Sequence, residues 1–302
     1  MSDTPTPESA PSDAPTPDRA PPGRAQPDDI TLIAWERLPP GFAETVRTIP
    51  EAPATPRPSA TIVLVRDGAG GRGDPEVLLL RRVRSAGFVP GAWVFPGGRV
   101  DAADRTPEAI ARWTPAGAPD RLADRLGLAD PVEAAGYVNA ALREALEETG
   151  VPVALTPRPD TRALSAVRTR LLDDALDWAA TLVALDAHID AASLAWIAHW
   201  VTPVQEPRRY DTRFFLARVE RDLPLELATE EMSDGRWIGV DAALAAHAEG
   251  ALPMVFPTIR TLEGLRGFAS ADAMLEHARS VEVPRILPRL VAEAEGVRMV
   301  ID

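Results

Sequence analysis

One segment of the chain, Arg143–Gly150, reads Arg-Glu-Ala-Leu-Glu-Glu-Thr-Gly. Glu144, Glu147 and Glu148 stand at positions i, i+3 and i+4 of a predicted helix, so their carboxylates share one face within a single turn. Three like charges at this spacing destabilise a helix, and near its C-terminus the helix dipole also disfavours anions. A divalent cation removes both penalties, because Mg²⁺ prefers oxygen ligands and shares them with phosphate groups. The segment therefore predicts a metal site, in which Arg143 pairs with Glu147.

The alternative interpretation is a glutamate-rich helix face in contact with solvent, which is common. However, the string Arg-Glu-x-x-Glu-Glu-x-Gly fixes several positions, and chance matches are expected on the order of once in a thousand chains of this composition. The helix itself is predicted from Pro131 to Thr149, because Asp130 is a typical N-cap, Pro131 suits the first helical position and Gly150 is a typical C-cap.

Composition limits the classes of function. The chain has 302 residues, of which 45% are hydrophobic and 25% charged, as in soluble globular proteins. Its formal net charge of -13 disfavours extended contact with a nucleic-acid backbone. The absence of cysteine and lysine excludes disulfides, thiolate metal sites, cysteine nucleophiles and Schiff-base chemistry. No apolar run is long enough to span a membrane, no secretory signal is visible, and we expect a cytoplasmic protein.

The chain is predicted to consist of a tail and one α/β domain. Residues 1–29 are rich in Pro, Ala, Ser, Thr and Asp, which predicts a disordered acidic segment. Residues 30–302 are predicted to form the domain, and the glycine-rich loop at 68–74 favours a hairpin turn over a phosphate cradle. Apolar or β-branched runs of strand length occur at 30–35, 60–65, 76–82, 92–95, 151–155, 200–204, 212–219 and 236–240.

Helices are predicted from apolar residues that recur at 3.6-residue spacing. Residues 105–130 are of mixed character and include a short helix that begins at Thr106. Residues 161–198 show the helical period over most of their length, so we expect helices there whose main role is packing. Further helices are predicted at 241–247, 257–268 and 271–278.

Arg143–Gly150 resembles the end of the Nudix box, whose pattern is Gly-x5-Glu-x7-Arg-Glu-apolar-x-Glu-Glu-x-Gly-apolar. Gly98 matches the first glycine of that pattern, and Asp104 stands where the first glutamate belongs. The departure is in the spacing, since 38 residues separate Asp104 from Arg143 where the box has seven, an insertion of 31. The resemblance implies a Nudix α/β/α sandwich with a mixed central sheet, a helical insertion at 105–130 inside the box and extra helices after it.

The split box is similar to that of the Nudix branch that includes the peroxisomal coenzyme A diphosphatases. The related signature is Leu-Leu-x-x-Arg-(Ser/Ala)-x3-Arg-x3-Gly-x3-Phe-Pro-Gly-Gly. The chain matches it at Leu78, Leu79, Arg82, Gly91 and Phe95–Gly98. It departs at Val83, where the small residue belongs, and at Gly87, where the second arginine belongs.

The resemblance also implies roles for individual residues. Glu144, Glu147 and Glu148 would bind Mg²⁺ or Mn²⁺, and Glu144, Glu147 and Arg143 would take part in catalysis. A glutamate on the helix or on a later loop would accept the proton of the attacking water, and Glu231 is the candidate on the loop. The alternative for Glu231 is an ordinary solvated loop residue.

Further residues are candidates for substrate binding. Arg82, Gly97 and Gly98 belong to the matched signature. Arg208 and Arg209 can bind phosphate through two parallel hydrogen bonds each, and Tyr210 can stack on a base; the alternative is a strand edge with ordinary surface arginines. His188, His199, His247 and His277 lack any metal-binding spacing and are predicted to be structural or surface residues.

Three hypotheses follow. In the first, the chain is a Nudix diphosphatase that acts on a small nucleoside-diphosphate derivative, with coenzyme A or acyl-coenzyme A the leading substrate. In the second, the substrate is ADP-ribose, a dinucleotide or a nucleoside triphosphate. In the third, the fold is a ligand sensor or interaction module without turnover, although sensors of this kind usually lose box carboxylates. No nucleic-acid or membrane partner is expected, and a homodimer is compatible with the resemblance.

Overall fold

The central strands are apolar on both sides, because the sheet that they form is covered on both faces. The computed structural model describes residues 1, 32–35, 38, 42–68, 74–85 and 89–301. It contains an eight-stranded mixed sheet in the order β10-β3-β2-β9-β8-β11, with β4 paired to β3 and β5 to β2. The strands are β2 (Arg57–Arg66), β3 (Glu76–Arg82), β4 (Trp93–Val94), β5 (Gly97–Arg99), β8 (Leu194–Val201), β9 (Tyr210–Arg218), β10 (Met232–Gly239) and β11 (Arg285–Ile286).

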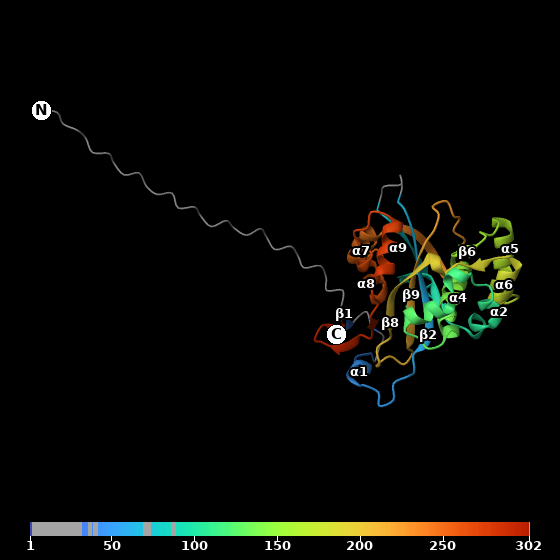
Figure 1. The fold of residues 1–302 in the computed structure, drawn as a ribbon. Helices are drawn as coiled ribbons and strands as arrows, with labels where there is room; N and C mark the ends of the chain where they lie inside the picture. The colour runs from blue at the N-terminus through green and yellow to red at the C-terminus, as the bar shows by residue number, and fades with distance from the viewer. Residues whose placement is uncertain (2–31, 36–37, 39–41, 69–73, 86–88, 302) are drawn as a thin grey trace.

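Alternate residues of each strand contribute to two separate cores. In β9, Phe215 and Ala217 pack on one side of the sheet, and Phe214 and Leu216 pack on the other. The pairs β2–β9 and β8–β11 are parallel, and the other pairs of this sheet are antiparallel. Figure 1 shows α4 with α2, α5 and α6 on one side of these strands, and α7, α8 and α9 on the other.

The layer that contains α4 (Pro131–Thr149) comes from the middle of the chain. Its other helices are short, and two small strands pair beside them. The elements are η2 (Ala102–Arg105), α2 (Pro107–Ile110), η3 (Pro115–Gly117), α3 (Pro119–Leu126), β6 (Leu155–Thr156), α5 (Thr161–Leu172), α6 (Trp178–Ala184), β7 (His188–Ile189) and η4 (Ala191–Ser193).

The opposite layer consists of helices from the last third of the chain. They are α7 (Val240–Ala248), α8 (Phe256–Gly264) and α9 (Ala271–Ser280). A three-stranded sheet lies beside this sandwich and joins the two ends of the described chain. It is formed by β1 (Leu32–Ala34), β13 (Gly296–Val300) and β12 (Arg289–Ala292), and α1 (Phe42–Arg47) packs against it.

The predicted α/β/α sandwich with a mixed sheet is confirmed, as is the predicted helix before Gly150. The Asp130 side chain accepts a hydrogen bond from the amide of Val132 at 2.8 Å, and Gly150 ends the helix in the left-handed conformation at φ 72°. The hairpin between β2 and β3 is present in the register Val65↔Val77, although residues 69–73 of its loop lie outside the described residues.

The prediction of helix over most of 161–198 is wrong after Ala184. Helix occupies Thr161–Leu172 and Trp178–Ala184, and a strand begins at Leu194, six residues before the strand predicted at 200–204. This strand is buried on both faces, and such an apolar run cannot be distinguished from a buried helix by periodicity. Similarly, of the strand predicted at 151–155 only Leu155 pairs with another strand, in the two-residue strand β6.

The tail predicted at 1–29 falls, apart from Met1, outside the described residues and stays a prediction. Within the part of the chain that is described, no helix is both long and apolar enough to cross a bilayer.

Candidate active site

The last two turns of α4 carry the acidic residues of the quoted segment. Glu148 is buried, with 2% of its surface exposed, while Glu144 and Glu147 are partly accessible from solvent. The helix places all three on the side that faces β2 and β5, since Glu148 accepts a hydrogen bond from the Gly97 amide at 3.0 Å. The carboxylates therefore line the junction between the helix and the short strand β5.

Arg143 connects these carboxylates to the start of the insertion. Its Nη1 donates to Glu144 at 3.0 Å and to Glu147 at 2.9 Å, which confirms the predicted pairing. Its Nε and Nη2 donate to the two carboxylate oxygens of Asp104 at 3.0 and 3.1 Å, and Nη2 also donates to the carbonyl of Arg99 at 3.0 Å. A planar guanidinium can satisfy this many acceptors at fixed angles, whereas a lysine cannot.

Asp104 anchors Arg143. It is fully buried, and burial raises the pKa of its carboxyl while the hydrogen bond and charge of Arg143 oppose that rise. The buried Asn139 of α4 donates to the Asp104 carbonyl at 2.7 Å and accepts from the Trp113 indole at 3.0 Å. The two halves of the split pattern, with the first part of the insertion, are thus joined on the helix.

Gly97 and Gly98 allow β5 to lie directly against the acidic turn. A Cβ built on Gly98 would lie 2.5 Å from Cδ of Glu144, so a larger residue here must displace that carboxylate. A Cβ built on Gly97 would lie 2.8 Å from the Thr61 Cα, so a larger residue there must displace backbone. The two glycines are therefore required for different reasons, one by the acidic site and one by the sheet.

Burial disfavours the charged forms of the carboxyl groups at this junction. It raises the pKa of Glu144 to about 7 against the opposing charge of Arg143. Burial, reinforced by the charge of Glu144, raises the pKa of Glu148 well above its ordinary value. Burial also raises the pKa of Glu147, again opposed by Arg143. The charge of the exposed Glu231 contributes to the increase at both Glu147 and Glu148.

Arg82 also lies close to the acidic turn, because its positive charge opposes the rise in the pKa of Glu148. It is held near Glu231 by the backbone, since the amide of the next residue, Val83, donates to the Glu231 carbonyl at 2.9 Å. The structure thus brings Arg82, Gly97, Gly98, Arg143, Glu144, Glu147, Glu148 and Glu231 to one place.

The donor set fits a hard divalent cation. Within the described ranges, no three acidic or histidine side chains form a ready-made metal cluster. The hydrogen bonds from Arg143 use one oxygen of Glu144 and one of Glu147. Carboxylate oxygens are the ligands that Mg²⁺ prefers, and the raised pKa values reflect buried negative charge that a cation would neutralise.

The segment from Arg208 to Tyr210 does not join this group. Arg209 is buried and donates to the carbonyls of Thr202 at 3.0 Å and Ala54 at 2.8 Å, so its guanidinium holds backbone. Tyr210 lies an even number of residues before Phe214, so it shares the sheet face opposite to α4. Arg208 is exposed and lies two residues before β9. The guanidinium of Arg209 is therefore bound to backbone and not to the acidic site, while substrate contacts of Arg208 and Tyr210 stay predictions.

Beside the acidic site, on the same face of the sheet, lies a buried polar network that the sequence did not indicate. His199 contacts Asp211 at 2.9 Å, and Arg213 contacts both residues. The Arg213 guanidinium lies 4.6 Å from the centre of the Tyr137 ring on α4, and burial raises the pKa of this tyrosine to about 12. His199 is thus one of the structural histidines predicted; its two partners lie on β9, and Arg213 links them to Tyr137 on α4.

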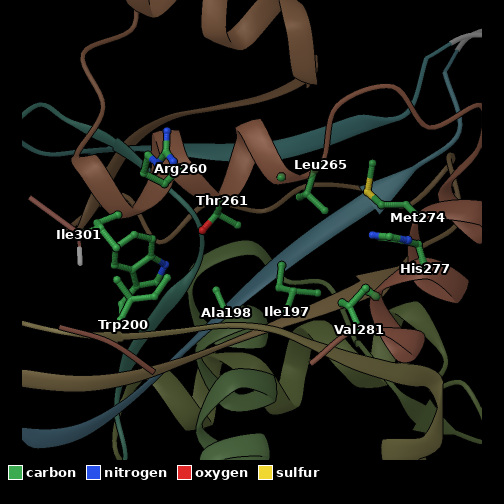
Figure 2. Close-up of a pocket in the computed structure, with 13 residues that line it drawn as sticks. Ile197, Ala198, Trp200, Arg260, Thr261, Leu265, Met274, His277, Val281 and Ile301 are labelled. Carbon is green, nitrogen blue, oxygen red and sulfur yellow. The ribbon is translucent and has the colours of Figure 1, made fainter. Parts of the chain in front are cut away.

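A hollow of about 300 Å³ lies on the other side of the sheet, between β8, α8 and α9. Figure 2 shows Ile197, Trp200 and Leu265 around it. Its lining includes none of the acidic residues of α4, so it is separate from the candidate active site.

The chain is similar to proteins of known family. The NUDIX domain model matches residues 55–114, which include Gly97, Gly98 and Asp104 and end before Arg143. A crystal structure of a NUDIX hydrolase from Alicyclobacillus acidocaldarius is 31% identical, with a TM-score of 0.59, and the match covers 74% of this chain and 97% of that one.

Two curated proteins are also similar. The acyl-coenzyme A diphosphatase NUDT19 of Homo sapiens is 27% identical over 269 residues, which cover 74% of this chain and 69% of that protein. "Putative nudix hydrolase 7" of Caenorhabditis elegans is 30% identical over 189 residues, and this match covers 61% of this chain and 55% of that protein. The chain therefore spans little more than half the length of the nematode protein.

Proposed function

We propose that this chain, which belongs to the Nudix hydrolase family, is a Mg²⁺- or Mn²⁺-dependent enzyme that hydrolyses the diphosphate bond of coenzyme A or an acyl-coenzyme A. One observation carries the proposal. Despite an insertion of 31 residues, the fold joins Gly98 and Asp104 to Arg143 and to the three glutamates of the box. Such an assembly would be costly to keep in a protein that has no use for a cation.

Glu144, Glu147 and Glu148 would hold the metal ion. When bound, the cation neutralises diphosphate charge and orients the attacking water. The protein holds the ligands of the cation in place. Arg143 donates hydrogen bonds to Glu144 and Glu147, and the Gly97 amide donates to Glu148. Water attacks one phosphorus atom of the diphosphate, and the bond between that phosphorus and the bridging oxygen breaks. The products are two phosphate monoesters.

Glu231 is the group that we propose to accept the proton of the attacking water. It is exposed, it lies on a different element from the box, and its charge acts on Glu147 and Glu148. A base must be accessible to water and close to the metal site, and the exposure of Glu231 and the effect of its charge on Glu147 and Glu148 support this role.

The choice of coenzyme A rests on relatives. Two vertebrate proteins, from Homo sapiens and Gallus gallus, are named acyl-coenzyme A diphosphatase NUDT19, and each match covers more than two thirds of both chains. Arg82, one of the signature residues present in this chain, has a positive charge that acts on the pKa of Glu148 at the acidic turn. ADP-ribose, dinucleotides and nucleoside triphosphates are the competing substrates.

The direct test is turnover by the purified protein with Mg²⁺ or Mn²⁺. We expect coenzyme A and acyl-coenzyme A to be cleaved into two phosphate monoesters faster than ADP-ribose, dinucleotides or nucleoside triphosphates, and Glu147→Gln to abolish this turnover. A preference for another of these compounds would overturn the substrate. Absence of turnover on all of them would favour a binding module.

The proton acceptor is tested with a matched pair of loop variants. We expect Glu231→Gln to lower kcat on the order of 10²-fold, as for loss of a general base. Glu230→Gln removes the same charge from the exposed neighbour and should leave kcat nearly unchanged. Equal rates in the two variants would remove Glu231 from the mechanism.

A further inference from the structure

The C-terminal turn of α4 needs partners from elsewhere in the chain. The last four carbonyls of a helix receive no hydrogen bond from an i+4 amide within it, and here that turn also carries Glu147 and Glu148. Thr149 and Glu148 use their carbonyls to accept from the amides of Glu226 at 2.9 Å and Ala228 at 3.1 Å. The loop before β10 thus closes half of the helix end.

Arg168 closes the other half. From α5, its Nε donates to the Leu146 carbonyl at 2.8 Å, and its Nη2 donates to the Glu147 carbonyl at 2.7 Å. The same Nη2 donates to the Glu226 carbonyl at 2.8 Å. Arg168 is 8% exposed, so a single buried guanidinium joins α4, α5 and the loop.

The loop that Arg168 holds leads to Glu231. The amides of Glu231 and Met232 both donate to the Ala228 carbonyl, at 3.0 and 2.8 Å, which makes a tight turn. The Glu231 carbonyl is fixed in turn by the amide of Val83 at 2.9 Å. Arg168 therefore holds the loop at Glu226, and two residues further along the chain Ala228 is hydrogen-bonded both to α4 and to the backbone amide of Glu231.

We propose that Arg168 is a positioning residue for the hydrolytic site: it fixes the separation between the box carboxylates on α4 and the carboxylate of Glu231. The inference rests on the proposed function, because that separation matters only if the two sets of carboxylates act on one substrate. Its positive charge at the C-terminus of α4 also offsets the helix dipole beside the glutamates. The planar guanidinium of arginine, with its several N–H donors, is needed here because one group binds three carbonyls at fixed angles.

The test compares Arg168→Met and Arg168→Lys with Arg170→Met. Arg170 lies two residues further along α5, is exposed, and provides the matched loss of charge. We expect Arg168→Met to lower kcat about 10- to 100-fold with a much smaller change in KM, as for residues that orient metal ligands. Arg168→Lys keeps the positive charge but lacks the planar guanidinium, so its kcat should be only slightly higher than that of Arg168→Met. Arg170→Met should behave like the wild type.

A second readout does not depend on turnover. We expect the half-saturating concentration of Mn²⁺, measured by calorimetric titration of the protein without substrate, to rise at least several-fold in Arg168→Met and to stay unchanged in Arg170→Met. If Arg168→Met does not fold, Arg168→Lys carries both measurements. Unchanged kcat and Mn²⁺ affinity in a variant that is merely less heat-stable would overturn the positioning role.

The two proposals fail in different ways. A wild-type protein that cleaves no diphosphate substrate contradicts the proposed function, and the Mn²⁺ titration still decides whether Arg168 positions the box carboxylates. An active wild type with an active Arg168→Met contradicts only the role of Arg168.

Discussion

The two ends of α4 are stabilised in different ways. The N-terminal end is closed by its own neighbours in sequence, since Asp130 caps the amide of Val132 and Pro131 begins the helix. The C-terminal end has a local cap in Gly150, whose amide donates to the Leu146 carbonyl, but its remaining carbonyls are bound by residues that are far away in sequence, Arg168 and the loop around Glu226. The end that is only structural is built locally, and the end that carries the acidic residues depends on the tertiary fold.

This difference has a physical basis. A cap at the N-terminus needs only one side-chain oxygen, which any Asp or Ser can provide. At the C-terminus, three carboxylates stand beside the negative end of the helix dipole, so the turn must be held against electrostatic repulsion. The fold does this with two buried arginines, Arg143 for the carboxylates and Arg168 for the carbonyls.

The largest effect should come from removing charge at the C-terminal end. We expect Glu148→Gln to lower kcat on the order of 10³-fold, because a metal ligand contributes several kcal/mol to catalysis. The amide keeps an oxygen that can accept from Gly97, so the fold should survive. Since burial raises the pKa of Glu148, its charged form is destabilising, and the metal-free variant should melt higher than the wild type at pH 8. A lower melting temperature would contradict this account of the site.

The next effect concerns the anchor of Arg143. We expect Asp104→Ala to lower the free energy of unfolding by about 3 kcal/mol, because it leaves a buried arginine without its principal partner. Chemical denaturation would measure this loss. The control is Asp101→Ala, whose half-exposed carboxylate lies 3.7 Å from Arg143 and should contribute less than about 1 kcal/mol. Equal losses would mean that Asp104 is not the anchor.

A smaller effect is expected where β5 meets the acidic turn. Gly98→Ala should displace the Glu144 carboxylate and lower kcat about 10-fold or more, with little change in melting temperature. Gly97→Ala, one residue away, should mainly lower the melting temperature, because its Cβ would meet backbone atoms of β2. If Gly98→Ala also acted mainly on stability, the close contact with Glu144 would have no catalytic meaning.

The acidity of the site should appear in the stability of the metal-free protein. The folded state raises the pKa of Glu144 from 4.5 to about 7, so it binds this proton more tightly than the unfolded chain does. The contribution of Glu144 to the free energy of unfolding should therefore fall as pH rises from about 4.5 to about 7. We expect scanning calorimetry to show a melting temperature that falls by a few degrees over this range, and less so in Glu144→Gln.

Added Mg²⁺ should raise the melting temperature more at pH 8 than at pH 5, since carboxylates must lose their protons to bind a cation. The pKa of Glu144 also depends on the charges of Arg143, Glu147 and Asp104. Comparison with Glu144→Gln therefore isolates the contribution of Glu144 to the pH dependence. An equal response to Mg²⁺ at both pH values would contradict binding through these groups.

The smallest effect should come from the N-terminal end. We expect Asp130→Ala to lower the free energy of unfolding by about 1 kcal/mol, the usual value of an N-cap, and to leave kcat, KM and Mg²⁺ dependence unchanged. Urea denaturation and steady-state kinetics would measure both. A loss of activity as large as that of Gly98→Ala would show that the two ends of α4 are not independent.

The same contrast explains how far the sequence could predict the molecule. The helix, its caps and its acidic face follow from residues that are close together in the chain, and each of them was predicted. Arg168 falls in the segment 161–198, on the face of the helix that also carries Leu164 and Leu171, and this spacing predicts that it is buried, unlike Arg170. The spacing does not show which carbonyls Arg168 binds, because Leu146, Glu147 and Glu226 come near it only in the tertiary fold.

The errors have a similar origin. The first part of the strand at Leu194–Val201, up to residue 198, was expected to be helical because a fully buried apolar run shows no strand alternation. Arg209 was expected to bind phosphate, and it instead binds the carbonyls of Thr202 and Ala54, which are brought near it only by the fold. An arginine side chain can bind either a phosphate group or backbone carbonyls, and the tertiary structure determines which of them lies within its reach.

The pairing of Asp104 with Arg143 has a consequence for how this protein can evolve. The two residues are 39 positions apart, yet two hydrogen bonds and the bridge through Asn139 fix their relation in space. The free-energy cost of closing such a loop, which is entropic, grows slowly, by about 0.6 kcal/mol for each doubling of the loop length. While Asp104 and Arg143 are paired, selection for the chemistry of the site does not fix the number of residues between them. The segment between the two residues can therefore gain, lose or exchange helices independently of the site.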